Sequence, residues 1–199
     1  MTTKSPARVK GAALRPVLGW YERSFGGGPI RQAVARLPPA IRADVEIRDG
    51  MPIVLSNTWY DARIVHALLD ETVGRLPPAE RARVGREASR GAIEETARGV
   101  YKFVLEQVVS PELYARHIQG LWRLLHDGGT REIRMVEQGV AVSEIRDWPG
   151  HHPILCVLTN ETMAALFEVM GMKDVVIQRE CCVSDGAPLC RTHVTWRKP

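Results

Sequence analysis

The sequence predicts an α+β fold in which a helical N-terminal half packs on a four- or five-stranded antiparallel sheet. Apolar residues recur at helical spacing from residue 13 to residue 126, and the pattern then changes to the alternation of strands. Between residues 132 and 196, two pairs of strand-like segments flank one helix, which gives the order hairpin–helix–hairpin. We expect residues 1–28 to form a flexible basic tail and a short helix, and residues 29–199 to form a single domain.

Breaks in the apolar spacing divide the N-terminal half into short elements. Gly26-Gly27-Gly28-Pro29 and Pro38-Pro39 each end a helix, and Asp49-Gly50 favours a turn between two short apolar runs. Ser110-Pro111 is typical of a helix start, with a cap and a proline in the first turn. The expected elements are a disordered tail over residues 1–12, helices over residues 13–25 and 30–37, a hairpin or extended connection over residues 45–55, and helices over residues 57–75, 79–107 and 113–126.

The helix expected over residues 79–107 carries a stripe of small residues. A glycine inside a helix costs about 1 kcal/mol relative to alanine. Several together therefore indicate that another helix, or a ligand, approaches the backbone closely. The stripe consists of Gly85, Ala88, Gly91, Ala92 and Gly99.

Strand alternation and turn residues define the elements of the C-terminal half. Gln138-Gly139 joins two strand-like segments, and Asp185-Gly186 lies between two others. The short apolar run over residues 154–158 is interpreted as a strand, so that Thr159 or Asn160 caps the helix after it. The expected elements are a hairpin over residues 132–136 and 140–148, the strand over residues 154–158, a helix that reaches residue 172, and a second hairpin over residues 174–182 and 189–196.

The charge and hydropathy of the chain exclude several classes of function. The net charge is +4, from 27 basic and 23 acidic residues, and a nucleic-acid-binding surface is usually denser in charge. Residues 1–43 hold eight Lys or Arg against one acid, Glu22. No run of eighteen apolar residues is present, and no apolar segment follows the basic N-terminus. We therefore expect a cytoplasmic protein with no membrane span, no secretory signal and no nucleic-acid partner.

The C-terminal hairpin brings two cysteines together. Cys182 and Cys190 are joined by the pattern Cys-x3-Gly-x3-Cys, in which Asp185-Gly186 forms the turn. A three-residue loop places Cys182 opposite Cys190, with Cβ atoms about 4.5–5.5 Å apart. A two-residue loop pairs Cys181 with Cys190 instead. We prefer the first register, because it places two thiolates close enough to share one metal ion.

Two further side chains complete a candidate tetrahedral zinc site. In the preferred register Glu180 shares a face with Cys182, and Cys156 lies upstream, in the short strand expected before the helix. Three thiolates and one carboxylate leave no open position on the metal, so the zinc would be structural. The predicted ligands are Cys156, Glu180, Cys182 and Cys190.

Other interpretations of the same cysteines stay open. Free cysteines are often buried as small apolar residues, so the cluster is also consistent with reduced structural thiols. A disulfide between Cys182 and Cys190 is a third interpretation, although clustered cysteines in a reducing cytoplasm favour metal or free thiols. Cys156 with His151 or His152 forms a weaker candidate for a thiolate–imidazolium pair. Haem binding through His66 or His117 is also considered, although a lone histidine in a helix is usually structural.

At the cysteine hairpin the chain resembles the 4-vinyl reductase domain family, whose relatives include haem-based nitric-oxide sensors and TRAPP vesicle-tethering subunits. That family ends in a Cys-x3-Gly-x3-Cys hairpin after a helix and an upstream cysteine, matched here by Cys156, Cys182, Gly186 and Cys190. The likeness covers roughly residues 57–196. A fainter likeness, which carries no activity, is to an uncharacterised family expanded in myxobacteria.

The acidic zinc ligand of this family does not transfer cleanly. Zinc-bearing members place it three residues before the first hairpin cysteine, where this chain has Arg179. Glu180 is one position away, so the resemblance requires a bulge or a different fourth ligand.

The resemblance implies a 4-vinyl reductase/TRAPP-like α+β domain, commonly a homodimer, that holds an apolar, aromatic or acyl small molecule between helices and sheet. On this basis we expect a non-catalytic ligand-binding or sensory domain with structural zinc. The alternatives are an enzyme acting on a tetrapyrrole or other apolar substrate, and a ligand-free dimeric scaffold or adaptor. The large side chains that would line the pocket, or else form ordinary core, are Trp59, Tyr60, Tyr101, Phe103, Trp122, Met163 and Phe167.

Overall fold

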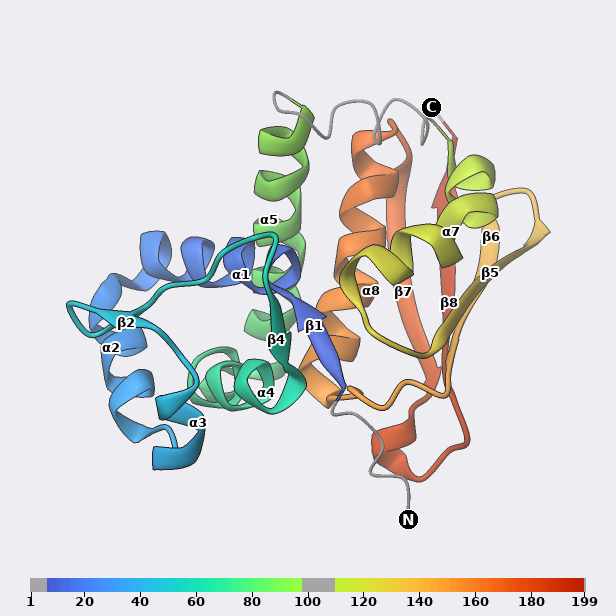
Figure 1. The fold of residues 1–199 in the computed structure, drawn as a ribbon. Coiled ribbons are helices and arrows are strands. Elements are labelled where there is room, and N and C mark those ends of the chain that lie inside the picture. The colour runs from blue at the N-terminus through green and yellow to red at the C-terminus, as the bar shows by residue number, and fades with distance from the viewer. Residues whose placement is uncertain (1–6, 98–109, 199) are drawn as a thin grey trace, which may run out of the picture.

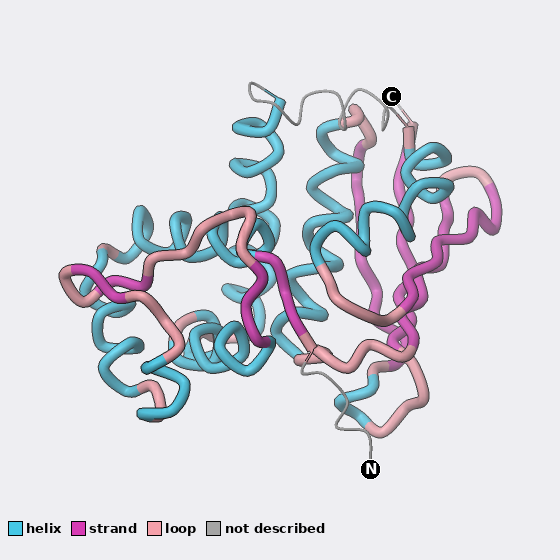
Figure 2. Tube along the Cα trace, in the orientation of Figure 1, coloured by secondary structure: helices cyan, strands magenta, loops and turns pink. Residues whose placement is uncertain are grey.

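The computed structural model describes residues 7–97 and 110–198 (Figure 1). It confirms the predicted fold class, because helices of the N-terminal half pack on a four-stranded antiparallel sheet (Figure 2). Among the described residues, no helix combines the length and the hydropathy that a membrane crossing requires. In chain order the elements are β1 (Arg8–Lys10), α1 (Gly11–Phe25), α2 (Gly27–Arg36), α3 (Pro39–Ala43), β2 (Ile47–Arg48), β3 (Met51–Pro52), β4 (Trp59–Asp61), α4 (Ala62–Glu71), the 3-10 helix η1 (Val73–Arg75), α5 (Pro78–Ala97), α7 (Pro111–Leu125), β5 (Thr130–Glu137), β6 (Val140–Arg146), α8 (Pro153–Val169), β7 (Lys173–Cys181), the 3-10 helix η2 (Val183–Asp185) and β8 (Cys190–Arg197).

The large sheet has the strand order β5-β6-β8-β7, and all neighbouring strands are antiparallel. Both predicted hairpins are present, and β8 joins them by pairing with β6 and β7. Helices α7 and α8 lie against the same face of this sheet (Figure 1). Alternation along β8 buries one set of side chains on that face, namely Cys190, Thr192, Val194 and Trp196.

The N-terminal segment is more ordered than the sequence predicted. Residues Arg8–Lys10 form β1, which pairs with β4 through Val9 and Tyr60, although a disordered tail was expected up to residue 12. The predicted helix over residues 57–75 is correspondingly shorter, because its first residues form β4. Helix α4 begins at Ala62, where the Asp61 carboxylate accepts the Arg63 N–H at 2.9 Å. Local spacing could not reveal this change, because the strand depends on a partner about fifty residues away.

A tight turn joins β2 to β3, as the sequence predicted. Asp49 and Gly50 both have positive φ angles, of 51° and 76°. Two such residues in succession define the turn that best matches the twist of a two-stranded ribbon. Helix α5, by contrast, is described only to Ala97, so residues 98–107 of the predicted helix lie outside the described part of the chain.

Helix α8 corrects the strand predicted over residues 154–158. The helix begins at Pro153, because the His152 side chain caps it and proline suits the first turn. Asn160, predicted as a cap, is instead buried inside the helix and donates to the Thr192 hydroxyl at 3.1 Å. Because α8 is enclosed by α5 and the sheet, nearly all of its faces are apolar. A short run from such a helix has no periodicity that distinguishes it from a buried strand.

Helix α5 packs closely on α8 through the predicted stripe of small residues. A Cβ atom added at Gly85 would lie 2.9 Å from Cβ of Glu161 and 3.1 Å from Cδ2 of Leu158. At Gly91, further along the same helix, the same construction meets no heavy atom within 4 Å. The close approach of another helix is therefore confirmed at Gly85.

We expect Gly85→Val to destabilise the protein by about 1–3 kcal/mol, because overpacking forces α5 and α8 apart. Gly91→Val provides the matched control in the same helix. Its free energy of unfolding should stay within about 0.5 kcal/mol of that of the natural protein, since valine and glycine differ little in helix propensity. Urea unfolding of both variants measures the difference, and equal losses would contradict tight packing at Gly85.

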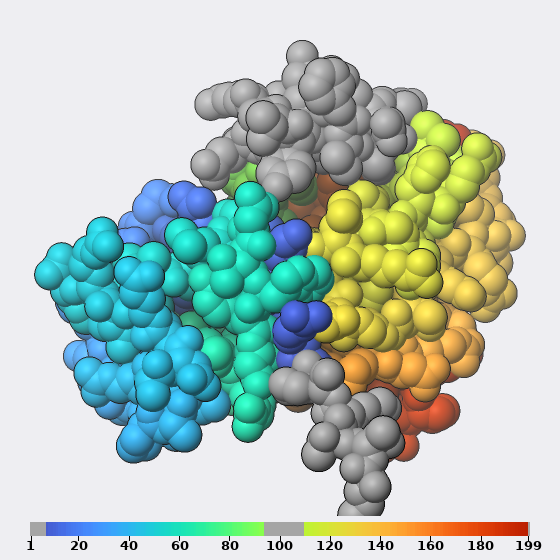
Figure 3. Space-filling model, viewed as in Figure 1, coloured from blue at the N-terminus to red at the C-terminus, as the bar shows by residue number. Residues whose placement is uncertain are grey.

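The core consists of two clusters that share α8. One cluster joins α1, α2 and α4 to the start of α8 and includes three of the cysteines. The other lies between α7, α8 and the sheet. In Figure 3 the N-terminal residues, blue to teal, meet the residues of α7, in yellow, along one boundary of this face.

Candidate metal centre and ligand cavity

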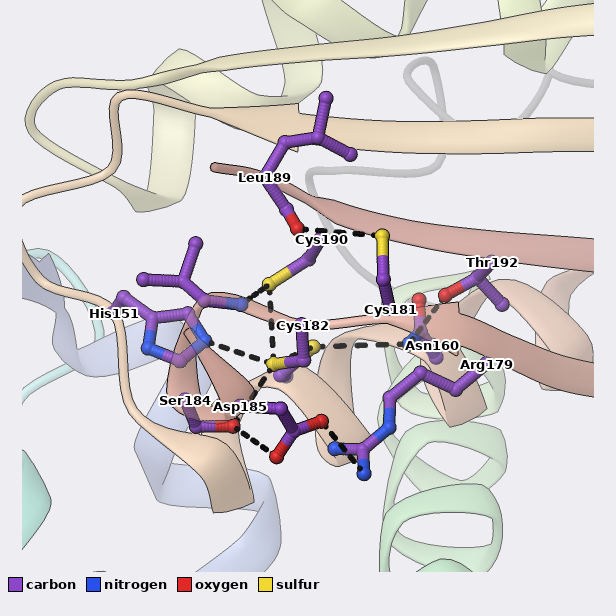
Figure 4. A network of polar contacts seen from close by, with 12 residues as sticks. His151, Asn160, Arg179, Cys181, Cys182, Ser184, Asp185, Leu189, Cys190 and Thr192 are labelled. Atoms are coloured by element: carbon purple, nitrogen blue, oxygen red, sulfur yellow. Dashed lines mark hydrogen bonds and ion pairs between the residues drawn. The ribbon is translucent and has the colours of Figure 1, made fainter. Parts of the chain in front are cut away.

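Four side chains from three segments meet beside the start of α8. They are His151, Cys156, Cys182 and Cys190, and their donor atoms all lie within 4.8 Å of one another (Figure 4). The three cysteines are at most 2% exposed, whereas His151 is partly exposed. The structure thus brings together the three cysteines that the sequence singled out and adds a histidine to them.

The start of α8 positions two of these groups. The His152 ring accepts the Ile154 N–H at 3.3 Å, and its carbonyl accepts the Cys156 N–H at 2.9 Å. Cys156 therefore lies in the first turn of the helix with a fixed direction. His151 precedes the cap, outside the helix, and its ring reaches across to the cysteine hairpin (Figure 4).

The β7–β8 connection positions the other two. Cys181 pairs with Arg191, and the same register places Cys182 opposite Cys190, as preferred from the sequence. The ladder stops at Cys181, and the chain then forms the 3-10 turn η2 instead of a tight hairpin loop. Gly186 ends this turn with φ of 85°, a conformation that residues with a side chain rarely adopt.

The spacing of the donor atoms matches a tetrahedral metal site. The Cys182 sulfur lies 3.2 Å from that of Cys190, 3.9 Å from that of Cys156 and 3.3 Å from Nε2 of His151. Around a zinc ion, bond lengths near 2.3 Å for sulfur and 2.0 Å for nitrogen give edges of roughly 3.5–3.8 Å. The sulfur separation of Cys182 and Cys190 exceeds the length of about 2.05 Å in a disulfide, and all four cysteines of the chain are free. The cluster can therefore hold a metal ion with small adjustments.

Hydrogen bonding within the cluster favours a thiolate at Cys190. The hydrogen bond from the Cys156 thiol lowers the pKa of Cys190, assisted by the Val183 N–H at 3.4 Å and opposed by burial. The same hydrogen bond, together with burial, raises the pKa of Cys156. The Ser184 hydroxyl also donates to the Cys182 sulfur, at 3.1 Å. A thiolate is the form of cysteine that binds metal ions.

Glu180, the carboxylate predicted for this site, is not part of the cluster. It is exposed and, on the outer face of the sheet, forms an ion pair with Arg191 at 2.9 Å and a hydrogen bond with His193 at 2.7 Å. A register irregularity between Arg179 and Cys181 shifts the strand at this residue. Hydrogen bonds from His193 and then Arg191 lower the pKa of Glu180. The prediction assumed a regular strand, and the bulge changes the face on which the carboxylate lies.

His151 is the member of the cluster that strand parity did not reveal. The two adjacent histidines have different roles, since His152 caps α8 and lies 3.3 Å from the Asp70 carboxylate. The available signal was Pro153, which marks the helix start and so leaves His151 in a loop five residues before Cys156. The spacing of His151 and Cys156 predicts that their side chains meet only if residues 154–158 form a helix rather than a strand.

A cavity of about 360 Å³ lies between α1, α5, α7 and α8. Its wall is mostly apolar, and its size falls within the range of small-molecule sites. Basic groups from the ends of β1, α7 and β5 also reach it. The main apolar side chains of its wall are Val17, Ile118, Leu121, Leu155, Leu158 and Leu166.

Of the pocket residues predicted from the sequence, Trp122 lies in this wall. Met163 and Phe167 are fully buried in the core cluster under the sheet. Trp59 and Tyr60 lie in β4, where the Tyr60 hydroxyl accepts the Leu55 N–H at 2.9 Å. The other two predicted residues, Tyr101 and Phe103, lie outside the described residues.

His126 is a buried titratable group in the cavity wall. Its ring stacks on Trp122, with centroids 3.9 Å apart, and meets the edge of Trp148 at 4.8 Å. It is 5% exposed, and Nδ1 has no hydrogen-bond partner among the described residues. Burial first, and the charge of Arg131 second, lower the pKa of His126 to about 3. The ring is therefore neutral at physiological pH.

Comparison by sequence gives no match, either with protein-family models or with curated proteins. Comparison of structures, in contrast, shows that nearly the whole chain is similar in fold to solved H-NOX (haem-NO/oxygen binding) domains.

An H-NOX protein from S. oneidensis, in the Fe(II) state of a triple mutant, matches with a TM-score of 0.69 and 12% identity, over 95% of this chain and 96% of the other. The Fe(II)NO form of an S. oneidensis H-NOX protein matches with a TM-score of 0.65 and 14% identity, over 95% of this chain and 99% of the other. The Fe(II) unliganded H-NOX protein from K. algicida matches with a TM-score of 0.63 and 13% identity, over 96% of this chain and 97% of the other. The chain thus has an H-NOX-like fold. The predicted likeness to the haem-based nitric-oxide sensors is confirmed as a likeness of fold, and membership of the 4-vinyl reductase family or of its superfamily stays a prediction.

The described residues do not fit a haem. Neither histidine considered from the sequence lines the cavity, since His117 is exposed and His66 bonds to the Gly150 carbonyl at 3.0 Å. His126 is the histidine of the described wall, and its ring is enclosed by two indoles rather than facing a flat slot. We therefore derive no function through haem.

Proposed function

We propose that the protein is a non-catalytic small-molecule-binding domain of the sensory type, braced by a structural zinc ion. The observation that carries this proposal is the apolar cavity of about 360 Å³ between the four helices α1, α5, α7 and α8. Preformed apolar cavities with a few polar groups are the usual form of a small-ligand site. The H-NOX-like fold supports the same class of function.

Zinc suits the donor set of the candidate metal centre. Three thiolates and one imidazole in a buried, near-tetrahedral group favour zinc over hard cations, which prefer oxygen. Because four protein ligands fill the coordination sphere, the ion would be structural. It would tie the start of α8 to the β7–β8 connection, and another face of α8 forms part of the cavity wall.

Native mass spectrometry combined with metal analysis of the purified full-length chain tests the proposal. The expected result is one zinc per chain and a bound apolar molecule that denaturation releases. Protein that is metal-free and empty, and that binds no small apolar molecule, would contradict it. A haem absorption band would instead show that the protein binds haem, and the proposal would be wrong.

The fourth ligand is tested separately by His151→Ala and Glu180→Gln. Loss of a residue that only hydrogen-bonds to a metal ligand typically costs about 10–100-fold in metal affinity. Loss of His151, which would bind the metal directly, should therefore lower the affinity at least about a hundredfold. Glu180→Gln should leave the affinity unchanged, because its carboxylate pairs with Arg191 and His193. Competition with a zinc-binding dye measures both values. Normal affinity in His151→Ala together with a loss in Glu180→Gln would restore the ligand set predicted from the sequence.

The remaining expectations stay predictions. A cytoplasmic homodimer follows from the sequence and its resemblance, and sedimentation of the purified chain tests its oligomeric state. The alternatives, an enzyme acting on an apolar substrate or a ligand-free scaffold, are separated from the proposal by the same ligand measurement.

A further inference from the structure

Arg131 is a buried charge in the cavity wall that no acidic side chain of the described residues neutralises. The residue is 4% exposed and lies at the start of β5. Its guanidinium contacts neutral groups at long distances, namely Oγ of Ser143 at 3.4 Å, the Tyr114 hydroxyl at 3.5 Å and Sδ of Met163 at 3.6 Å. The ring centroid of Trp122 is 6.0 Å away. Within the described ranges, no carboxylate forms an ion pair with Arg131.

The other buried charges of the described chain are paired. Glu144 is also 4% exposed, and it accepts the Arg191 guanidinium at 2.7 Å and a second hydrogen bond from Arg146. Glu161, 8% exposed, accepts Nε of Arg86 at 2.7 Å. An unpaired buried ion is strongly unfavourable, whereas an ion pair recovers much of that cost. Arg131 is therefore an exception that calls for an anionic partner.

Both charged side chains of the described cavity wall are positive, namely Lys10 and Arg131. The described wall contains neither Asp nor Glu. His126 also lines the wall, but its ring stays neutral and adds no third positive charge. Lys10 lies near the edge, with its ammonium 5.3 Å from the Trp59 ring centroid. The deepest positive charge is thus that of Arg131.

We propose that the cavity binds an apolar carboxylic acid, with its carboxylate on Arg131 and its aliphatic or aromatic body against the apolar wall. This inference rests on the proposed ligand-binding function and names its ligand class. A guanidinium presents a planar pair of N–H groups that matches a carboxylate in two parallel hydrogen bonds. One guanidinium balances one negative charge, whereas a phosphate monoester carries about −1.5 to −2 near pH 7. The apolar side chains around it suit a hydrocarbon body rather than a sugar or a peptide.

Matched acids and alcohols test the proposal on the natural full-length protein after removal of retained ligands. The probes are decanoate against 1-decanol, and 4-phenylbutyrate against 4-phenylbutanol, each titrated while Trp fluorescence is recorded, since Trp122 lines the cavity. Within at least one pair, the acid should bind about ten- to a hundredfold more tightly, the range expected for hydrogen bonds to a charged group. Equal binding of acid and alcohol in both pairs would overturn the proposal.

Two variants assign the preference to Arg131. Arg131→Met keeps the volume and removes the charge, so the acid should lose its advantage while the alcohol binds as before. Arg131→Lys keeps the charge without the paired N–H geometry, and it should retain part of the preference. An unchanged preference in Arg131→Met would overturn the assignment. If Arg131→Met does not fold, the acid-to-alcohol ratio in Arg131→Lys and in the natural protein still decides.

The outcomes separate this inference from the proposed function. Retention of a neutral or cationic molecule that neither acid displaces overturns the anionic ligand but leaves the ligand-binding function intact. A protein that retains nothing and binds neither acids nor alcohols overturns both.

Discussion

Replacing Cys182 with serine is expected to lower the free energy of unfolding by at least about 3 kcal/mol. The residue is fully buried, and its sulfur contacts three other members of the metal cluster. Loss of the ion would release the β7–β8 connection from α8. At about 2–4 °C per kcal/mol for a chain of this size, the melting temperature should fall by roughly 6–12 °C. Differential scanning calorimetry measures the change.

The chain provides a matched control in the adjacent cysteine. Cys181 lies outside the cluster and directs its thiol towards the Leu189 carbonyl, 3.6 Å away (Figure 4). Cys181→Ser should therefore melt close to the natural protein. A zinc chelator should lower the melting temperature of the natural protein and of Cys181→Ser, but not further lower that of Cys182→Ser. A natural protein that melts unchanged with chelator would show that no structural metal exists and would favour reduced thiols.

Acid should destabilise the protein through His126. The folded pKa is about 3, whereas an unfolded histidine titrates near 6.5. Below pH 6.5 the histidine therefore binds a proton in the unfolded chain but not in the folded protein. The free energy of unfolding falls by about 1.4 kcal/mol per pH unit until pH 3. Between pH 7 and pH 5 this one residue should remove about 2 kcal/mol. Above pH 6.5 its contribution is constant.

The measurement compares the natural protein with His126→Phe by urea unfolding at pH 7 and pH 5. Phenylalanine keeps a ring between Trp122 and Trp148 but does not titrate, so the variant should lose about 2 kcal/mol less on acidification. His66 and His152, whose pKa values burial also lowers, remain in both proteins and cancel. His117→Gln, at an exposed position, serves as the control and should keep the natural slope. Identical slopes for His126→Phe and the natural protein would show that the ring is solvated.

The structure places Cys182 opposite Cys190, as expected from the sequence, and this agreement has a local cause. Asp185-Gly186 between two strand-like segments limits the hairpin to two registers, and one of them places Cys182 opposite Cys190. The turn itself differs from the prediction, since η2 replaces a tight loop. A register is a property of neighbouring residues, and it can be predicted without the rest of the fold.

The position of Glu180 outside the cluster has a different cause. Whether Glu180 faces the cysteines depends on a single bulge, and no residue type in β7 marks it. His151 enters the cluster because α8, rather than a strand, follows it, and that choice depends on burial by α5 and the sheet. The second feature is set by contacts between segments far apart in the sequence.

The sequence by itself determined the fold class, the two C-terminal hairpins and the grouping of Cys182 with Cys190, because turns, breakers and alternation act over a few residues. The tertiary structure alone decided the fourth member of the candidate metal centre, the position of the cavity and the absence of an acidic partner for Arg131 among the described residues. A buried charge has meaning only through what surrounds it, and its surroundings come from β5, β6, α7 and α8 together. Burial and pairing over long distances are properties of the packed chain, which no local pattern contains.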